Sequence, residues 1–228
     1  MRFQYGEFRL TRAYAIGDVH GCLEQLQRLV ELCEQDAASQ KSTFIFLGDY
    51  IDRGPDSRGV IEFLMNLQKW SPDEIICLRG NHEDLLLAAL QGEDAEFSWL
   101  ANGADTTLHS YKASRASDLP APHIDWIRSL SLFHDEGRRL FVHAGVHPDR
   151  PLNQQRSRDL LWIREPFLSS DKDFGRLIVH GHTPLKSGMP DLKSNRLNLD
   201  TGAVYGRALT AAVFSEHQAA PLKFIRSD

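Results

Sequence analysis

Short apolar runs alternate with amphipathic stretches over the first part of the chain, and this alternation constrains the fold more than any other feature. The first three runs each end at or near a glycine and span residues 13–16, 43–47 and 74–78. Apolar residues at helical spacing follow each run, over residues 23–33, 60–67 and 85–90. This strand–loop–helix rhythm predicts an α/β fold with its strands packed inside.

The remainder of the chain is organised differently. The pattern over residues from about 94 to 132 predicts a mostly helical segment, with one break at Asn102-Gly103 and another at Pro120-Ala121-Pro122. Later apolar runs have little helical pattern between them and span residues 140–142, 177–179, 197–199, 210–214 and 222–225. We therefore expect a second sheet. No repeat or linker divides the chain, so residues 1–228 are predicted to form a single domain.

The bulk composition is that of an ordinary globular enzyme, with 42% hydrophobic and 25% charged residues. No apolar run approaches the ~18 residues that a membrane span needs, and residues 1–7 lack the apolar stretch of a secretory signal. The formal charge of -5 argues against an extended nucleic-acid surface. Three cysteines without metal-finger spacing read as reduced thiols. These features predict a cytoplasmic protein without a membrane partner.

Polar side chains suited to metal binding directly follow the apolar runs. They are Asp18, His20, Asp49, Asp52, Asn81, His82, His143, His180 and His182. Because ligands bind at the carboxyl ends of strands in open α/β sheets, we expect these residues at one edge. Carboxylates, imidazoles and an amide oxygen suit Mn, Fe or Zn. A carboxylate between two such ions can hold them ~3.5–4 Å apart, as in two-metal hydrolases.

Three arginines lie beside these residues in the sequence, namely Arg53, Arg79 and Arg164. A guanidinium group donates two parallel hydrogen bonds to phosphate oxygens, so phosphate is a better candidate ligand than a peptide or a sugar. An arginine can instead be only an ion-pair partner or lie exposed, and the residues alone leave this open for Arg53 and Arg164. The histidines outside these motifs are interpreted as surface or core residues: His109, His123, His134, His147 and His217.

Read together, five motifs resemble the signature of the phosphoprotein phosphatase family, within the wider calcineurin-like metallophosphoesterases. They are Gly17-Asp18-Val19-His20-Gly21, Gly48-Asp49-Tyr50-Ile51-Asp52-Arg53-Gly54, Gly80-Asn81-His82-Glu83, His143-Ala144-Gly145 and His180-Gly181-His182-Thr183. Asp200-Thr201-Gly202-Ala203 extends the likeness, and the compact length resembles small phage and bacterial members. The resemblance implies two central β-sheets packed together, with helices outside.

The resemblance also implies roles for individual residues. Two divalent metal ions, with Mn²⁺ favoured and Fe or Zn as alternatives, would be held by Asp18, His20, Asp49, Asn81, His143 and His182. Asp49 would bridge the two ions, and His180 would point away from them. His82 would be the general acid, oriented by Asp52. Arg53, Arg79 and Arg164 would contact or frame the phosphate, which a metal-bridging hydroxide would attack directly.

The substrate implied by the resemblance is phosphoserine or phosphothreonine in a protein, with phosphotyrosine a further candidate. The nearest alternative is hydrolysis of dinucleoside polyphosphates such as diadenosine tetraphosphate. Asp52-Arg53-Gly54 and Asn81-His82-Glu83 favour the phosphatase branch, because symmetrical tetraphosphatases tend to read Ala-Arg-Gly and Asn-His-Asp at these places.

Two other function classes are weaker. A non-catalytic scaffold on the same fold would have lost a metal ligand or the acid, yet every expected residue is present. A metal-dependent nuclease would need a basic groove with interleaved aromatic residues, and the sequence, with a formal charge of -5, shows no such pattern. A phosphoprotein or a phosphorylated small molecule is therefore the expected partner, and the sequence does not define the oligomeric state.

Overall fold

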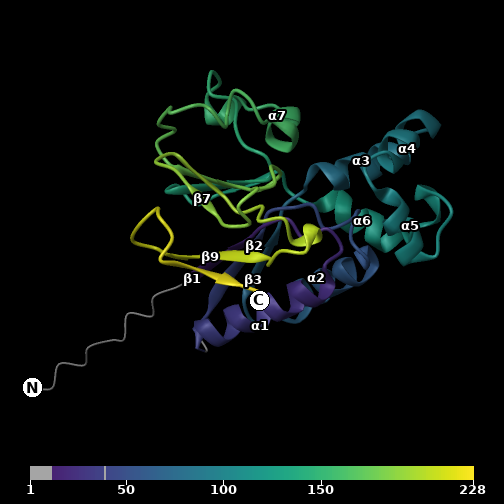
Figure 1. Cartoon of the computed structure of the whole chain (residues 1–228), viewed down its shortest axis with the longest axis horizontal. Coiled ribbons are helices and arrows are strands. Elements are labelled where there is room, and N and C mark those ends of the chain that lie inside the picture. The colour runs from purple at the N-terminus through teal and green to yellow at the C-terminus, as the bar shows by residue number, and fades with distance from the viewer. Residues whose placement is uncertain (1–11, 39) are drawn as a thin grey trace, which may run out of the picture.

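The computed structural model describes residues 12–38 and 40–228 (Figure 1). Residues 1–7, on which the expectation of no secretory signal rests, lie outside this description. Within the described ranges, no helix is both long and apolar enough to cross a membrane.

Two five-stranded sheets form the centre of the molecule (Figure 1). The first sheet has the order β10-β9-β1-β2-β3 and consists of β1 (Arg12–Ile16), β2 (Ser42–Phe46), β3 (Glu74–Cys77), β9 (Thr210–Ser215) and β10 (Lys223–Arg226). The second has the order β4-β5-β6-β8-β7 and consists of β4 (Phe133–Asp135), β5 (Arg139–Val142), β6 (Leu177–His180), β7 (Asp191–Leu192) and β8 (Arg196–Asn198). Strands β1 to β3 run parallel, as do β5, β6 and β8.

The two sheets pack face to face because successive side chains of a strand point to opposite faces. In β1, Ala13 and Ala15 belong to the apolar cluster between the sheets, whereas Tyr14 and Ile16 belong to the cluster under the helices. From the second sheet, Phe141 enters the inter-sheet layer and meets Phe214 edge to face, with ring centroids 5.9 Å apart. The predicted fold class, α/β with two packed central sheets flanked by helices, is confirmed.

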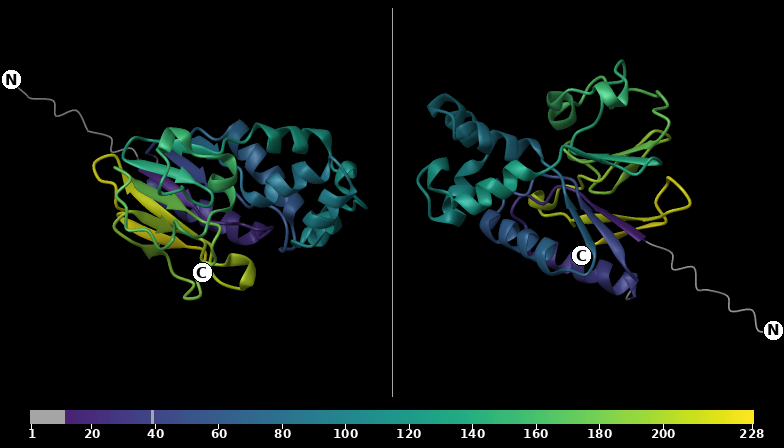
Figure 2. Two further views of the ribbon diagram at one scale, coloured as in Figure 1. Left: turned by 90° about the horizontal axis from the view of Figure 1, so that it is seen from above. Right: turned by 180° about the vertical axis from the view of Figure 1, so that it is seen from behind.

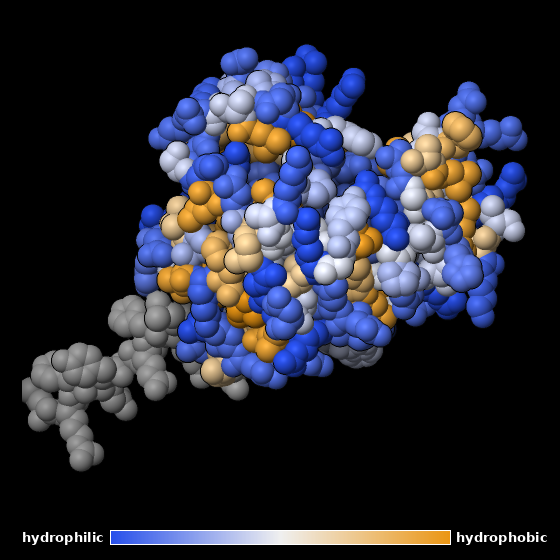
Figure 3. Space-filling view, in the orientation of Figure 1, coloured by the Kyte–Doolittle hydropathy of each residue, from blue (hydrophilic) through white to orange (hydrophobic). Residues whose placement is uncertain are grey.

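Helices cover the outer face of the first sheet and extend to one side of it (Figures 1 and 2). The covering helices are α1 (Leu23–Ala37) and α2 (Ser57–Trp70). A helical segment beside the sheets contains α3 (Asn81–Ala89), α4 (Glu93–Leu100), α5 (Ala104–Tyr111), the 3-10 turn η1 (Ala116–Asp118) and α6 (Ala121–Ser129). Figure 3 shows apolar residues gathered on part of this segment, where α4 exposes Phe97 and Leu100.

The helix breaks follow local sequence. Gly103 has a left-handed φ of 96° between α4 and α5, and α6 begins directly after Pro120. Several short elements were not anticipated, namely β4, β7, α7 (Ser157–Trp162) and the 3-10 turns η2 (Leu152–Gln154) and η3 (Ala203–Tyr205). They contain two to six residues each, which is too few to give a clear periodicity.

Candidate metal centre and active site

The loops that follow strands of both sheets bring the predicted polar residues together. Asp18 and His20 follow β1, Asp49 and Asp52 follow β2, Asn81 and His82 begin α3 after β3, and His143 and His182 follow β5 and β6. All eight side chains are buried. The strand ends therefore place the acids, imidazoles and amide in one cluster, as expected for ligand sites at the carboxyl edge of parallel strands.

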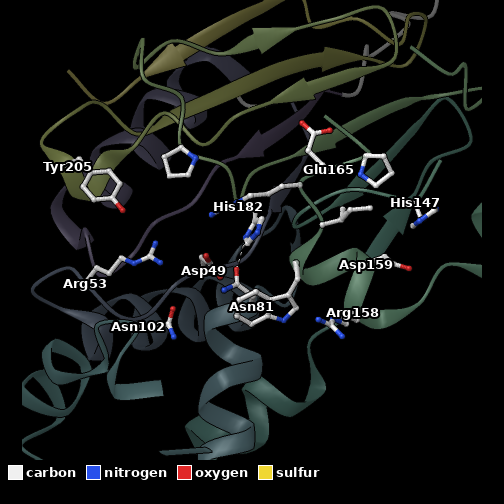
Figure 4. A pocket seen from close by; sticks show the side chains of 15 residues that line it. Asp49, Arg53, Asn81, Asn102, His147, Arg158, Asp159, Glu165, His182 and Tyr205 are labelled. Carbon is white, nitrogen blue, oxygen red and sulfur yellow. Dashed lines mark hydrogen bonds between the residues drawn. The ribbon is translucent and has the colours of Figure 1, made fainter. Parts of the chain in front are cut away.

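Asp49 connects the two halves of this cluster, and Figure 4 shows it beside Asn81 and His182. It belongs to two groups of potential ligand atoms, one with His20 and His82 and the other with His143 and His182, each lying within 4.8 Å. Its Oδ2 is 3.4 Å from Nε2 of His20, and its Oδ1 is 3.3 Å from Nε2 of His143. A carboxylate that presents one oxygen to each group has the geometry of a bridging ligand.

Backbone carbonyls define which nitrogen of two ligand histidines carries the proton. Nδ1 of His20 is 2.8 Å from the Ile51 carbonyl, and Nδ1 of His143 is 2.9 Å from the Leu47 carbonyl. Because a carbonyl only accepts, both Nδ1 atoms must donate, and in a neutral ring this leaves a lone pair on each Nε2. Burial, the largest effect, lowers the pKa of His20 to about 3 and also lowers the pKa of His143. Both rings are therefore neutral, as metal-binding imidazoles must be.

Electron pairs converge at the second group. Nε2 of His143 lies 2.8 Å from Oδ1 of Asn81, and Nδ1 of His182 also lies 2.8 Å from that oxygen. Since Nε2 of His143 has no proton, its contact with the amide oxygen brings two lone pairs together unless a cation lies between them. This donor set fits a divalent metal.

Two further carboxylates, those of Asp18 and Asp200, add negative charge near Asp49. Burial raises the pKa of Asp18 most, and the neighbouring charges of Asp200 and Asp49 raise it further. Burial and Asp49 likewise raise the pKa of Asp200 to about 7. Buried carboxylates that repel one another are stabilised by a bound cation. His20 and Asp49 with His82, and Asp49 with His143 and His182, could each hold a metal ion. Asp18 belongs to neither group, and its assignment to the first metal stays a prediction.

The backbone at these residues is unusually constrained. Seven non-glycine residues have a positive φ in residues 12–38 and 40–228, and five of them are His20, Asp49, Asp52, Arg53 and His182. The other two, Ala38 and Lys112, are helix C-caps, where this conformation is common. Left-handed backbone at a non-glycine residue costs about 1–3 kcal/mol and is concentrated at functional sites. The chain thus uses strained turns to direct these side chains inward.

Glu83 supports the loop that carries Asp49. Its carboxylate is fully buried and accepts hydrogen bonds from the N–H groups of Asp49, Tyr50 and Gly80 at 2.9, 2.8 and 2.8 Å. It is not among the residues that line the cleft over the metal centre. Glu83 therefore positions the central ligand and does not face a substrate.

His82 and Asp52 form a buried pair beside the metal centre. Nδ1 of His82 is 2.7 Å from Oδ2 of Asp52, and Nε2 of His82 has no hydrogen-bond partner within the described chain. Burial opposes protonation of His82, but the charges of Asp49 and Asp52 outweigh it and raise its pKa above the ordinary value. Nε2 of His82 lies 4.0 Å from Oδ2 of Asp49. A protonated imidazole with a free Nε2 can therefore donate a proton to a group bound beside Asp49.

A cleft of about 590 Å³ opens over Asp49, Asn81 and His182 (Figure 4). Arg53 and Tyr205 lie on one side of it, and Arg158 and Asp159 lie on the other. Trp162, Arg164, Glu165 and His147 also line it. The cleft is larger than a phosphate ion, so a bound phosphoester would extend beyond the metal centre.

Comparisons with known proteins decide the family. The family model described as calcineurin-like phosphoesterase matches residues 11–214. The chain belongs to this family. It is also 32% identical over 211 residues to serine/threonine-protein phosphatase 1 of Salmonella typhimurium, covering 87% of this chain and 90% of the relative. Together with the fold and the motifs, this confirms the resemblance to the phosphoprotein phosphatases.

Another relative has a different activity in its name. The chain is 30% identical over 227 residues to bis(5'-nucleosyl)-tetraphosphatase PrpE [asymmetrical] of Bacillus thuringiensis, covering 88% of this chain and 89% of that protein. A cold-active protein-tyrosine phosphatase from a psychrophilic Shewanella species has a similar fold, with a TM-score of 0.68 and 16% identity over 91% of this chain and 76% of that one. The family therefore defines phosphoesterase chemistry but leaves the substrate open.

The predicted arginines separate in this calcineurin-like fold. Arg53 and Arg164 line the cleft, and Nη1 of Arg53 donates at 2.8 Å to Nε2 of His20, whose single lone pair a bound metal would take in place of this hydrogen bond. Arg79 does not line it, because its Nη2 donates to the carbonyls of Arg128 and Leu130 at 2.7 and 3.4 Å. This arrangement does not support a phosphate contact by Arg79, and Arg53 and Arg164 remain the candidate phosphate ligands.

The structure also places three residues that are not proposed ligands. His180 is buried against Phe167, with ring centroids 5.0 Å apart, and belongs to neither ligand group. His147, interpreted from sequence as a surface or core residue, lines the cleft. Asp200 received no role, although it directly follows the strand run at 197–199, as the predicted ligands follow their own strands. This position after a strand was the sequence signal that could have identified Asp200 as a site residue.

Proposed function

We propose that this protein is a metal-dependent phosphomonoesterase that removes phosphate from phosphoserine and phosphothreonine in proteins. The observation that carries the proposal is the His82–Asp52 pair, buried beside Asp49 with Nε2 of His82 unpartnered. The alkoxide of serine or threonine is a strongly basic leaving group, so its departure requires a proton. A positioned acid contributes typically ~10²–10⁴-fold to such a reaction.

The other residues have complementary roles in this proposal. Arg53 and Arg164 bind and orient the phosphate oxygens from the cleft walls. Asp52 holds the imidazole of His82 in the orientation in which Nε2 faces the leaving oxygen. Two divalent ions, which we expect to be Mn²⁺, would be held by Asp18, His20, Asp49, Asn81, His143 and His182. When bound, they would supply a water of lowered pKa and neutralise charge on the phosphate.

A second candidate function is hydrolysis of a dinucleoside polyphosphate. The specific observation in its favour is the lining of the cleft, where Trp162 and Tyr205 are exposed aromatic residues and Arg158 adds a cation on the side opposite Arg53. Aromatic faces can stack on nucleobases, and arginines can bind additional phosphates. The likeness to the B. thuringiensis tetraphosphatase supports the same reading.

One set of rates separates the two candidates. We would measure kcat/KM of the Mn²⁺-loaded protein on phosphoserine, phosphothreonine and phosphotyrosine peptides and on diadenosine tetraphosphate. The proposal expects the phosphoserine or phosphothreonine peptide to have the higher kcat/KM by at least about tenfold, equivalent to about 1.4 kcal/mol. A preference of that size for diadenosine tetraphosphate would overturn it in favour of the second candidate.

A further inference from the structure

Asp52 is held by more partners than His82 alone. Its side chain is fully buried, and its Oδ2 accepts from Nδ1 of His82 at 2.7 Å and from the indole N–H of Trp99 at 2.9 Å. Its Oδ1 accepts from the hydroxyl of Thr107 at 2.6 Å. Trp99 lies in α4 and Thr107 in α5, so both additional donors come from the helical segment beside the sheets.

Counting protons defines the direction of the bonds at Thr107. Its hydroxyl has one hydrogen, which it donates to Oδ1 of Asp52. The Asp52 N–H at 2.9 Å and the Ser57 hydroxyl at 2.8 Å must therefore donate to the lone pairs of Thr107. A single buried hydroxyl thus binds both the backbone and the side chain of Asp52.

The backbone of this loop needs such support. Asp52 and Arg53 are consecutive non-glycine residues with φ of 70° and 68°. Strained backbone of this kind persists only where surrounding contacts determine it. The Arg53 N–H donates to the Gly103 carbonyl at 3.0 Å, in the turn between α4 and α5. Trp99, Gly103 and Thr107 therefore contact the loop at three points spaced four residues apart.

We propose that Trp99 and Thr107 are positioning residues that orient the proton donor His82 through Asp52. This inference rests on the acid role of His82 in the proposed function, and it gives the helical segment a part in the reaction. Each oxygen of Asp52 has a fixed donor, so the carboxylate cannot rotate away from the imidazole. Removing either donor frees the carboxylate and misdirects Nε2 of His82.

A purely structural role would give a different result. Trp99 is fully buried in the apolar core, so its loss could simply loosen the fold and slow every reaction equally. A misdirected acid slows only those reactions in which the leaving group needs a proton. Phenyl phosphate releases phenolate, a base with a pKa of about 10, like that of tyrosine. The leaving group of 2,4-dinitrophenyl phosphate is a much weaker base and departs without a proton.

The experiment compares these two substrates with matched variants. Trp99→Phe and Thr107→Val remove one donor each while keeping most of the side-chain volume. Trp126→Phe and Ser98→Ala are controls from the same helical segment, since they remove donors to Gln68 and to the Asp94 carbonyl, away from the Asp52 loop. Metal content and melting temperature are measured for every variant.

We expect kcat on phenyl phosphate to fall about 10–100-fold in Trp99→Phe and Thr107→Val, a part of the ~10²–10⁴-fold that an acid supplies. On 2,4-dinitrophenyl phosphate it should fall less than about threefold, and both controls should stay within that range on both substrates. Thr107→Ser keeps the hydroxyl and should recover the phenyl phosphate rate. In an Asp52→Asn background, Thr107→Val should add no further selective loss, because the coupling passes through Asp52.

His82→Asn distinguishes failure of this inference from failure of the proposed function. If His82→Asn loses phenyl phosphate activity selectively but Trp99→Phe and Thr107→Val slow both substrates equally, the positioning role is overturned and the acid role stands. If His82→Asn itself shows no selectivity, the acid role is wrong and the inference is overturned with it.

Discussion

Gly181 offers a test of the metal centre in which no proposed ligand is replaced. A Cβ atom built at Gly181 would lie within 3.0 Å of Oδ1 of Asp18, a distance that real Cβ atoms essentially never show. Ordinary van der Waals contact begins at 3.4 Å, so Asp18 would have to retreat by at least 0.4 Å (3.4 − 3.0). Metal–ligand distances tolerate changes of only about 0.2 Å. Gly181→Ala should therefore disconnect Asp18 from the first metal.

Stability should change much less than metal binding. Overpacking of a buried site costs about 1–3 kcal/mol, and Gly→Ala returns about 0.4–1 kcal/mol by restricting the unfolded chain. The net loss of about 0–2.6 kcal/mol leaves most of a typical folding free energy of about 5–15 kcal/mol. Losing a partner that only orients a ligand weakens metal binding by about 10–100-fold. Losing Asp18 itself should exceed that.

The assay measures bound Mn²⁺ per chain after gel filtration, together with hydrolysis of p-nitrophenyl phosphate. Gly181→Ala should lose about one of two ions and at least about 100-fold in kcat/KM, with partial recovery in excess Mn²⁺. Gly92→Ala is the matched control, because Gly92 is extended, with a φ of 164°, and nothing lies within 4 Å of its added Cβ. Full metal content and full activity in Gly181→Ala would refute the assignment of Asp18 as a ligand.

Four further predictions address the same site. Asp49→Asn should abolish activity and lower the content of both metals, and a fully metallated, active variant would contradict the bridging role. Chelated protein should regain p-nitrophenyl phosphate hydrolysis on addition of Mn²⁺; continued inactivity would favour a scaffold. The protonated form of His82 is lost as pH rises through its pKa, and because the hydrogen bond and charge of Asp52 raise that pKa, Asp52→Asn should shift the alkaline limb of kcat to lower pH. Glu83→Asp should lower the melting temperature but leave unchanged the ratio of kcat/KM on the phosphoserine peptide to kcat/KM on diadenosine tetraphosphate. A changed ratio would contradict the conclusion that Glu83 only positions the metal loop.

The site could be predicted from sequence to the extent that strand ends define it. Asp18, Asp49 and His143 each follow a strand by one to three positions, so their convergence follows from sheet geometry. Asp200 follows the same rule, since it comes two positions after β8, although the family motifs assigned it no role. The two central sheets were predictable in part, since β1, β2, β5, β6 and β9 contain apolar runs, whereas β4 and β7 are too short and polar to show one.

Long-range hydrogen bonds could not be predicted in this way. Trp99 and Thr107 lie 47 and 55 positions from Asp52, and no local pattern marks a tryptophan or a threonine as a donor to a buried carboxylate. The direction of a long side chain was equally hidden. Arg79 precedes Gly80-Asn81 in the sequence, yet its guanidinium turns to the carbonyls that end α6 because those acceptors lie within its reach.

Substrate preference has a different origin from chemistry in this fold. The motif Asn81-His82-Glu83 favours the phosphatase branch, but Glu83 binds the backbone N–H groups of Asp49 and Tyr50 and does not face the cleft. Glu83 can therefore distinguish branches of the family without contacting the substrate. The residues that a leaving group would meet lie mostly in 158–166 and in η3, outside the five motifs. Since the motifs hold the proposed metal ligands and these segments form the cleft walls, substitutions in the walls should alter substrate preference without loss of metal.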